Sequence, residues 1–215
     1  TEVKKQVKSL GFTTVEFYEK DGAQAYRFMN KTDLVIACRG TQPTEFNDIS
    51  ADLKAIPVMA ETVSRVHRGF KAEVDELWPM IEEDINRKAN VSKTLWFCGH
   101  SLGAGMATIM ASRAKHNVEL NDPVGLYTFG SPRVGSKAFA ELFNNCVDVS
   151  YRCVRRKDPV AFTPLPLRFT HVRGGLKFDK DVKKLELGTL TVFKCFGCKV
   201  DDHSMSKYHN FCLTL

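Results

Sequence analysis

The sequence predicts a single α/β domain, residues 1–215, with a central, mostly parallel sheet and helices on both faces of that sheet. Short apolar segments alternate along the chain with helical segments, and no repeat or low-complexity linker divides them. The 215 residues are 43% hydrophobic and 26% charged, which is typical of one folded domain with an ordinary core. Disordered, collagen-like and coiled-coil chains are excluded by this composition.

The chain is expected to begin with a β-hairpin. Apolar and polar residues alternate over 11–20 and 25–30, on either side of Lys20-Asp21-Gly22, a tripeptide typical of a tight turn. We therefore expect antiparallel strands to form one edge of the sheet.

Four later segments are predicted to be strands buried on both faces, because they are short and almost continuously apolar. They are residues 34–38, 94–98, 124–129 and 149–154. One helix is predicted from Phe70 to Ile85, where apolar residues recur every three or four positions, and another from Leu102. Pro79 lies inside the first helix and predicts a bend or a local break. The tail from 159 to 202 is expected to elaborate the same domain.

A nucleophile elbow is the most specific motif in the chain. Gly99-His100-Ser101-Leu102-Gly103 has the form G-x-S-x-G and lies directly between the strand 94–98 and the next helix. Glycines are needed two residues before and after the serine, because side chains there would collide with neighbouring backbone. The N–H groups of the helix start would stabilise an oxyanion. We therefore predict that Ser101 is a nucleophile.

An acid follows Ser101 in the chain order Ser, acid, His that such folds use. Asp158 lies just beyond the strand 149–154, at the end of the sheet where ligands bind in open α/β folds. An ion pair with Arg155 or Arg156 is the alternative role for this carboxylate. Two earlier aspartates precede their strands and are weaker candidates.

The general base is predicted to be His203 rather than His209. The spacing of apolar residues over 204–212 predicts a terminal helix that starts near Ser204, so His203 lies on the loop before it. His209 would be carried about 9 Å further along the helix axis, too far for both histidines to reach Ser101. We expect His209 to flank the packed face of the helix.

An oxyanion hole is predicted from Thr41 and Leu102. Thr41 directly follows the strand 34–38, where its backbone N–H and hydroxyl could join the N–H of Leu102, although a local turn bond is the alternative. The other histidines have simpler roles as surface or supporting residues. No spacing of His, Cys and carboxylate residues marks a metal site, so no metal or other cofactor is expected.

These motifs resemble the class 3 lipases, the fungal-type triacylglycerol lipases of the α/β-hydrolase fold. Beyond the elbow, the resemblance rests on Arg39-Gly40-Thr41, 46–53 (FNDISADL), 66–70 (VHRGF), 128–135 (TFGSPRVG), 156–159 (RKDP) and 203–208 (HSMSKY). It implies an α/β-hydrolase fold and the same triad of Ser101, Asp158 and His203, with an oxyanion segment at Thr41. In the lid the family usually carries a tryptophan, where this chain has Asp48 or Ile49.

The segment from Pro43 to Val58 is predicted to be a lid, because it follows the oxyanion strand and resembles the family's lid region. Its opening would expose an apolar rim. The spacing of Phe46, Ile49 and Leu53 also fits a face that packs permanently on the body. Both interpretations stay open.

The predicted function is that of a serine hydrolase that cleaves carboxylic esters of lipids through an acyl-enzyme, in the manner of a lipase or phospholipase. The alternative is a membrane-surface binding protein with the same fold and little or no turnover, which the net charge of +6 permits. The intact Ser, Asp and His set argues against this alternative. The expected partners are a lipid ester and, peripherally, a membrane or lipid aggregate. Nucleic acid is not expected, because no basic stripe or nucleic-acid motif is present; the oligomeric state stays open.

The seven cysteines are an odd number, and residues 1–10 contain no apolar signal core, so a cytoplasmic location is favoured; secretion after processing stays open. Cys195 and Cys198 have the spacing of a metal half-site or redox pair, but without a second pair a structural role is expected. No apolar run approaches the roughly 18 residues of a membrane-spanning helix.

Overall fold

The computed structural model describes residues 2–40, 56–61, 64–116, 124–155, 157–178, 186–187 and 203–212. The helices in this part are α1 (Glu2–Ser9), α3 (Arg68–Asn86), α4 (Leu102–His116), α5 (Lys137–Cys146), η2 (Val160–Phe162) and α6 (Met205–Cys212). The strands are β1 (Thr14–Lys20), β2 (Ala23–Met29), β3 (Asp33–Cys38), β4 (Pro57–Met59), β5 (Arg65–His67), β6 (Thr94–His100), β7 (Val124–Phe129), β8 (Val149–Arg155), β9 (Gly175–Phe178) and β10 (Glu186–Leu187).

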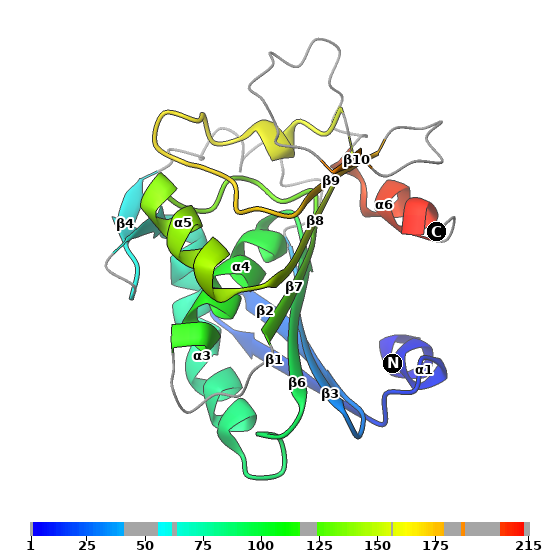
Figure 1. Ribbon diagram of the computed structural model, residues 1–215. Coiled ribbons are helices and arrows are strands. Elements are labelled where there is room, and N and C mark those ends of the chain that lie inside the picture. Colours follow the sequence, from blue (N-terminus) through cyan, green and yellow to red (C-terminus); the bar gives the residue numbers. More distant parts are fainter. Residues whose placement is uncertain are drawn as a thin grey trace.

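The centre of the molecule is a sheet with the strand order β1-β2-β3-β6-β7-β8-β9-β10. The pairs from β3 to β9 are parallel, while β1, β2 and β10 join antiparallel at the two edges. The helices α3, α4 and α5 cover one face, and α1 and α6 lie on the other (Figure 1). The predicted α/β architecture with a mostly parallel sheet is therefore confirmed.

The predicted hairpin is formed by β1 and β2, and it occupies one edge of the sheet. Its turn residues Asp21 and Gly22 have φ values of 49° and 90°. A two-residue turn with both φ values positive matches the twist of the flanking strands, and an Asp-Gly pair tolerates that conformation. The four predicted inner strands are also present, within two residues of the expected bounds.

Of the two outcomes predicted at Pro79, a bend or a local break, the break is wrong, because α3 continues through this residue to Asn86. A proline inside a helix removes one hydrogen bond and crowds the preceding turn. In α3 this cost is offset by burial on both sides of the proline, since Phe70, Val74, Leu77, Ile81 and Ile85 are at most 4% exposed. Packing against the sheet and α4 thus keeps both halves as one helix.

Most of the predicted lid, residues 43–55, lies outside the described residues, and only its last three residues, 56–58, are described. Residues 57–59 form β4, which pairs with β5 in a separate two-stranded sheet. Val58 also packs against the main core. At Val58 the structure fits the alternative interpretation, in which the segment packs on the body, because backbone pairing and apolar contact hold this residue there.

The main core lies between the sheet and the helices α3, α4 and α5. Helix α4 is buried over almost its whole length, from Gly103 to Ala114. This central position places the N-terminus of α4 directly at the carboxyl end of β6. In the described part of the chain, no helix combines the length and apolar character that crossing a membrane requires.

Candidate active site

Ser101 stands on a strained turn between β6 and α4. Its φ is 58°, a left-handed value that non-glycine residues rarely adopt. Its backbone N–H donates to the carbonyl oxygen of Phe129 at the end of β7, over 3.0 Å. A Cβ at Gly99 would lie 2.2 Å from the carbonyl oxygen of Gly103, and a Cβ at Gly103 would lie 2.4 Å from that of Cys38. Both elbow glycines are therefore required by backbone packing.

The end of β3 passes directly against this turn. A Cβ at Gly40 would lie 2.4 Å from the carbonyl oxygen of His100 and 3.3 Å from the Cβ of Ser101. The next residue, the predicted oxyanion residue Thr41, lies outside the described residues. Leu102 is the first residue of α4, so its N–H is among the groups that a helix start leaves without an intrahelical partner.

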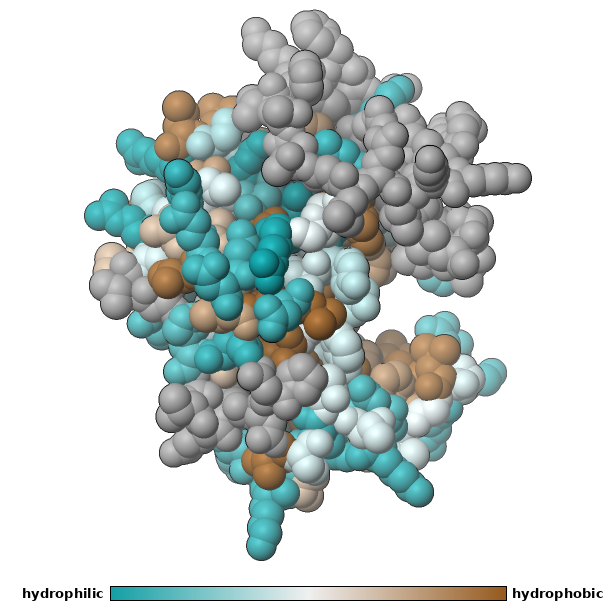
Figure 2. Space-filling model, in the orientation of Figure 1, coloured by the Kyte–Doolittle hydropathy of each residue, from teal (hydrophilic) through white to brown (hydrophobic). Residues whose placement is uncertain are grey.

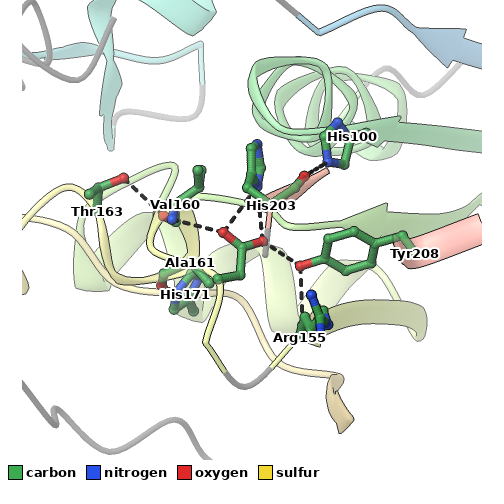
Figure 3. Close-up of polar contacts among 9 residues, drawn as sticks. His100, Arg155, Val160, Ala161, Thr163, His171, His203 and Tyr208 are labelled. Atoms are coloured by element: carbon green, nitrogen blue, oxygen red, sulfur yellow. Dashed lines mark hydrogen bonds and ion pairs between the residues drawn. The ribbon is translucent and has the colours of Figure 1, made fainter. Parts of the chain in front are cut away.

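Asp158 and His203 form a buried pair at the same edge of the sheet. The imidazole Nδ1 of His203 lies 2.9 and 3.0 Å from the two carboxylate oxygens of Asp158. The Asp158 carboxylate also accepts hydrogen bonds from the backbone N–H of Val160, over 2.9 Å, and from the hydroxyl of Tyr208 (Figure 3). Asp158 is completely buried and His203 is 6% exposed. These donors stabilise the negative charge on Asp158 and orient the imidazole.

Tyr208 is a site residue that the sequence analysis did not identify. It is completely buried on α6, and besides donating to Asp158 its hydroxyl accepts the backbone N–H of Arg155, over 3.1 Å. Burial, together with the neighbouring carboxylate, raises the pKa of Tyr208 well above its usual value, so the hydroxyl stays protonated and donates. The available signal was a tyrosine on the apolar face of a helix directly after a candidate base, since a buried hydroxyl needs a partner.

His100 connects the elbow to the loop of His203. Its Nε2 lies 2.8 Å from the carbonyl oxygen of His203, and the two rings stack with centroids 4.5 Å apart. Burial, and to a smaller extent the charge of His203, lower the pKa of His100 to about 4. At neutral pH His100 is therefore uncharged, and its ring N–H can hold the carbonyl group of His203.

Gly130 joins the two halves of the site. It follows Phe129, which binds the N–H of Ser101, and its own N–H donates to the carbonyl oxygen of Cys153 over 3.0 Å. Its φ is 58°, and a Cβ there would lie 2.7 Å from Asp158 Oδ2 and 2.9 Å from His203 Nδ1. The structure thus brings Ser101, Asp158 and His203 to the carboxyl ends of neighbouring strands.

His209 is exposed on α6. Tyr208, the residue before it, takes the buried position, and adjacent residues of a helix point in different directions. Cys195 and Cys198 lie outside the described residues. Within the part of the chain that is described, no group of three or more His, Cys, Asp or Glu residues could hold a metal ion.

Known proteins share this sequence pattern. A family model for class 3 lipases matches residues 35–167. A secreted mono- and diacylglycerol lipase of Fusarium solani is 34% identical over 130 residues, which cover 57% of this chain and 38% of that protein. Phospholipase A1-IIgamma of Arabidopsis thaliana is 27% identical over 206 residues, which cover 80% of this chain and 48% of that protein. The chain spans about a third to a half of the length of the curated relatives it matches.

The fold is also that of a solved lipase. The structure of a lipase from Rhizopus microsporus var. chinensis matches with a TM-score of 0.76 at 18% identity, over 93% of this chain and 76% of that chain. At this identity the likeness shows the fold, and it confirms the α/β-hydrolase fold. The family model covers more than half of the chain, including Ser101 and Asp158. The chain therefore belongs to the class 3 lipase family.

Proposed function

We propose that this protein is a serine hydrolase that cleaves carboxylic esters of lipids. The observation that carries the proposal is the buried contact between His203 and Asp158 at the sheet edge where Ser101 stands on its strained turn. A carboxylate that binds Nδ1 of an imidazole leaves Nε2 to accept a proton from a serine hydroxyl. This is the arrangement that nucleophilic catalysis by serine requires.

In the proposed reaction, the Oγ of Ser101 attacks the ester carbonyl carbon while His203 accepts the hydroxyl proton. Asp158 stabilises the resulting imidazolium, and the N–H of Leu102, together with Thr41, stabilises the oxyanion. His203 then protonates the leaving alcohol, and an acyl group remains on Ser101. Water activated by His203 attacks this acyl-enzyme in the same way and releases the carboxylic acid.

The substrate class is supported by the relatives, which are named as a mono- and diacylglycerol lipase and a phospholipase A1. Both names denote enzymes that act on lipids. A lipid ester is therefore the substrate class that we propose for this chain.

The test is covalent labelling with a fluorophosphonate, combined with release of p-nitrophenol from short and long acyl esters. The wild-type protein should be labelled and should release p-nitrophenol, and Ser101→Ala should do neither. Ser112→Ala is the matched control, because Ser112 is a buried serine on α4 whose hydroxyl has no hydrogen-bond partner. Labelling that persists in Ser101→Ala would refute the nucleophile. A folded wild-type protein that binds lipid without turnover would instead support a binding protein.

A further inference from the structure

A loop beside the candidate active site holds two leucines out in the solvent. Leu167 is 90% exposed and Leu165 is 73% exposed, although both are large apolar residues. The loop, residues 163–168, directly follows η2, and η2 begins two residues after Asp158. In Figure 2, hydrophobic surface gathers at the upper left, where Figure 1 shows the segment that follows η2.

This loop is firmly attached to the body at both ends. The side chain of Arg133 donates to the carbonyl oxygens of Phe162 and Pro164, the latter over 2.7 Å. After the loop, the N–H of Thr170 donates to the carbonyl oxygen of Gly135, over 2.7 Å. Because both ends are anchored, the fold itself presents the two leucines to the solvent. Clustered apolar side chains that a fold exposes in this way mark an interaction surface.

Further exposed apolar side chains lie on the neighbouring two-stranded sheet. Phe169, which follows the loop, packs against the ring of His67 at the end of β5, with centroids 5.8 Å apart. Beside it, Ile56 is 40% exposed and Met59 is 53% exposed. The leucine loop and the β4–β5 pair therefore form one apolar surface around the start of α3.

The charged side chains in the three segments that carry this surface are all arginines. Arg65, Arg68 and Arg168 are exposed, and within the described structure no ion pair joins any of the three to an acidic residue. The segments 56–59, 65–68 and 163–168 contain no Asp or Glu. Guanidinium groups bind phosphate and carboxylate oxygens in bidentate geometry. Exposed leucines beside unpaired arginines complement a surface with an apolar interior and an anionic outer layer.

We propose that this surface, which consists of Ile56, Met59, Leu165 and Leu167 with Arg65, Arg68 and Arg168, docks on an anionic lipid surface. Its apolar side chains enter the lipid, and its arginines bind the anionic headgroups. Docking at this place brings the active-site edge of the sheet to the lipid esters. The proposed docking surface rests on the proposed function, since docking would serve the hydrolysis of lipid esters. Binding of the protein to vesicles can nevertheless be measured without hydrolysis.

The experiment measures partition of the full chain, as Ser101→Ala so that no lipid is consumed, onto sedimented vesicles. One set of vesicles is phosphatidylcholine, and the other contains equal parts of phosphatidylcholine and phosphatidylglycerol. Leu165→Ser with Leu167→Ser should lower partition onto the mixed vesicles about tenfold or more, because two apolar side chains no longer enter the lipid. Leu10→Ser is the matched control: Leu10 is also 73% exposed, but it lies directly after α1. It should leave partition unchanged.

Arg168→Gln tests the headgroup. It should lower partition onto the mixed vesicles about fivefold and leave binding to phosphatidylcholine unchanged, because each arginine near an anionic surface adds about that factor. All variants are checked for an unchanged thermal unfolding midpoint, which exposed positions should preserve.

The two proposals fail in different ways. Partition that is unaffected by the double leucine change, or lowered equally by Leu10→Ser, overturns the docking surface even if the wild-type protein hydrolyses esters. Equal binding to both vesicle types, without an effect of Arg168→Gln, overturns the anionic partner. Loss of partition in the leucine variant, with no ester hydrolysis by the wild-type protein, leaves the docking surface standing and refutes the proposed function.

Discussion

The two sides of the candidate site, Ser101 on one and Asp158 with His203 on the other, are held in place by different kinds of contact. Ser101 is held by its own neighbours, because the elbow glycines pack backbone against backbone within 99–103 and against the end of β3. Asp158 and His203 are 45 residues apart in the chain and meet through side chains. Their position depends on Tyr208, on the turn at Gly130 and on His100, which is the one elbow residue among these three.

Substitutions on the two sides should therefore have different consequences. A change in the elbow displaces main-chain atoms that cannot move without disturbing β3 and α4, so it should cost stability. A change on the acid–histidine side removes or displaces a buried side chain without displacing the main chain of β3 or α4, so it should cost turnover first. Substitutions at His203, Gly130, Gly103 and Tyr208 test this contrast.

Removal of the base should have the largest effect. We expect His203→Ala to lower kcat for p-nitrophenyl esters by about three orders of magnitude or more, because no other group would then accept the serine proton. His209→Ala is the control, since His209 is exposed on α6 and should leave kcat near the wild-type value. Steady-state kinetics of both variants decide the assignment. Inactive His209→Ala beside active His203→Ala would show that the base is misassigned.

Two glycine substitutions contrast the two sides directly. Gly130→Ala should lower kcat about 100-fold in a protein that still folds, because the new methyl group pushes His203 and Asp158 out of place. Gly103→Ala should instead cost about 2–3 kcal/mol of unfolding free energy, because its methyl group meets the backbone of Cys38 and Arg39.

Urea unfolding and kcat are measured for both variants. Gly69→Ala is the control, because the nearest atom to its Cβ is a His67 side-chain atom at 3.3 Å. The contrast is lost if Gly130→Ala unfolds as readily as Gly103→Ala.

A smaller effect is expected for the positioning residue Tyr208. Tyr208→Phe removes the hydroxyl that binds Asp158 and should lower kcat about tenfold with little change in KM, since a hydrogen bond to a charged group is lost. Tyr18→Phe is the matched control, because Tyr18 is also buried and donates to a carboxylate, that of Asp84, outside the site. It should lower the thermal midpoint without changing kcat. Equal kcat for both variants would give Tyr208 a structural role alone.

The last prediction concerns the dependence of stability on pH. The pKa of His100 falls from 6.5 to about 4 on folding, chiefly through burial. Between these two pH values the imidazole of His100 is protonated in the unfolded chain and neutral in the folded chain. The free energy of unfolding therefore decreases as pH falls from about 6.5 towards 4. His100→Gln should remove up to about 3 kcal/mol of this loss. His67, whose pKa is also lowered to about 4, should still lower the stability of the variant at acid pH. Urea unfolding of the wild-type protein and of His100→Gln, at neutral pH and at pH near 4, measures the difference. An equal loss of unfolding free energy in the two proteins would contradict the role of His100.

Elements with a local cause could be predicted from the sequence. An alternating pattern around Asp-Gly predicts the hairpin, and steric conflict over a few residues predicts the elbow at Ser101. The chain order of Ser101, Asp158 and His203 follows from the strands that precede the first two and the helix that follows the third. These predictions depend on contacts close in sequence or on the period of buried residues, so they can be deduced without knowing the packing.

Features that depend on long-range contacts could not be predicted before the fold was known. Pro79 stays inside α3, and Val58 pairs with β5, because packing outweighs the local preference of each segment. The partners of Asp158, above all Tyr208, come from an element that reaches the carboxylate only after the sheet has formed. The exposure of Leu165 and Leu167 also depends on the assembled fold. Whether an apolar residue is buried or presented to solvent depends on which elements surround it, and this is a property of the assembled fold.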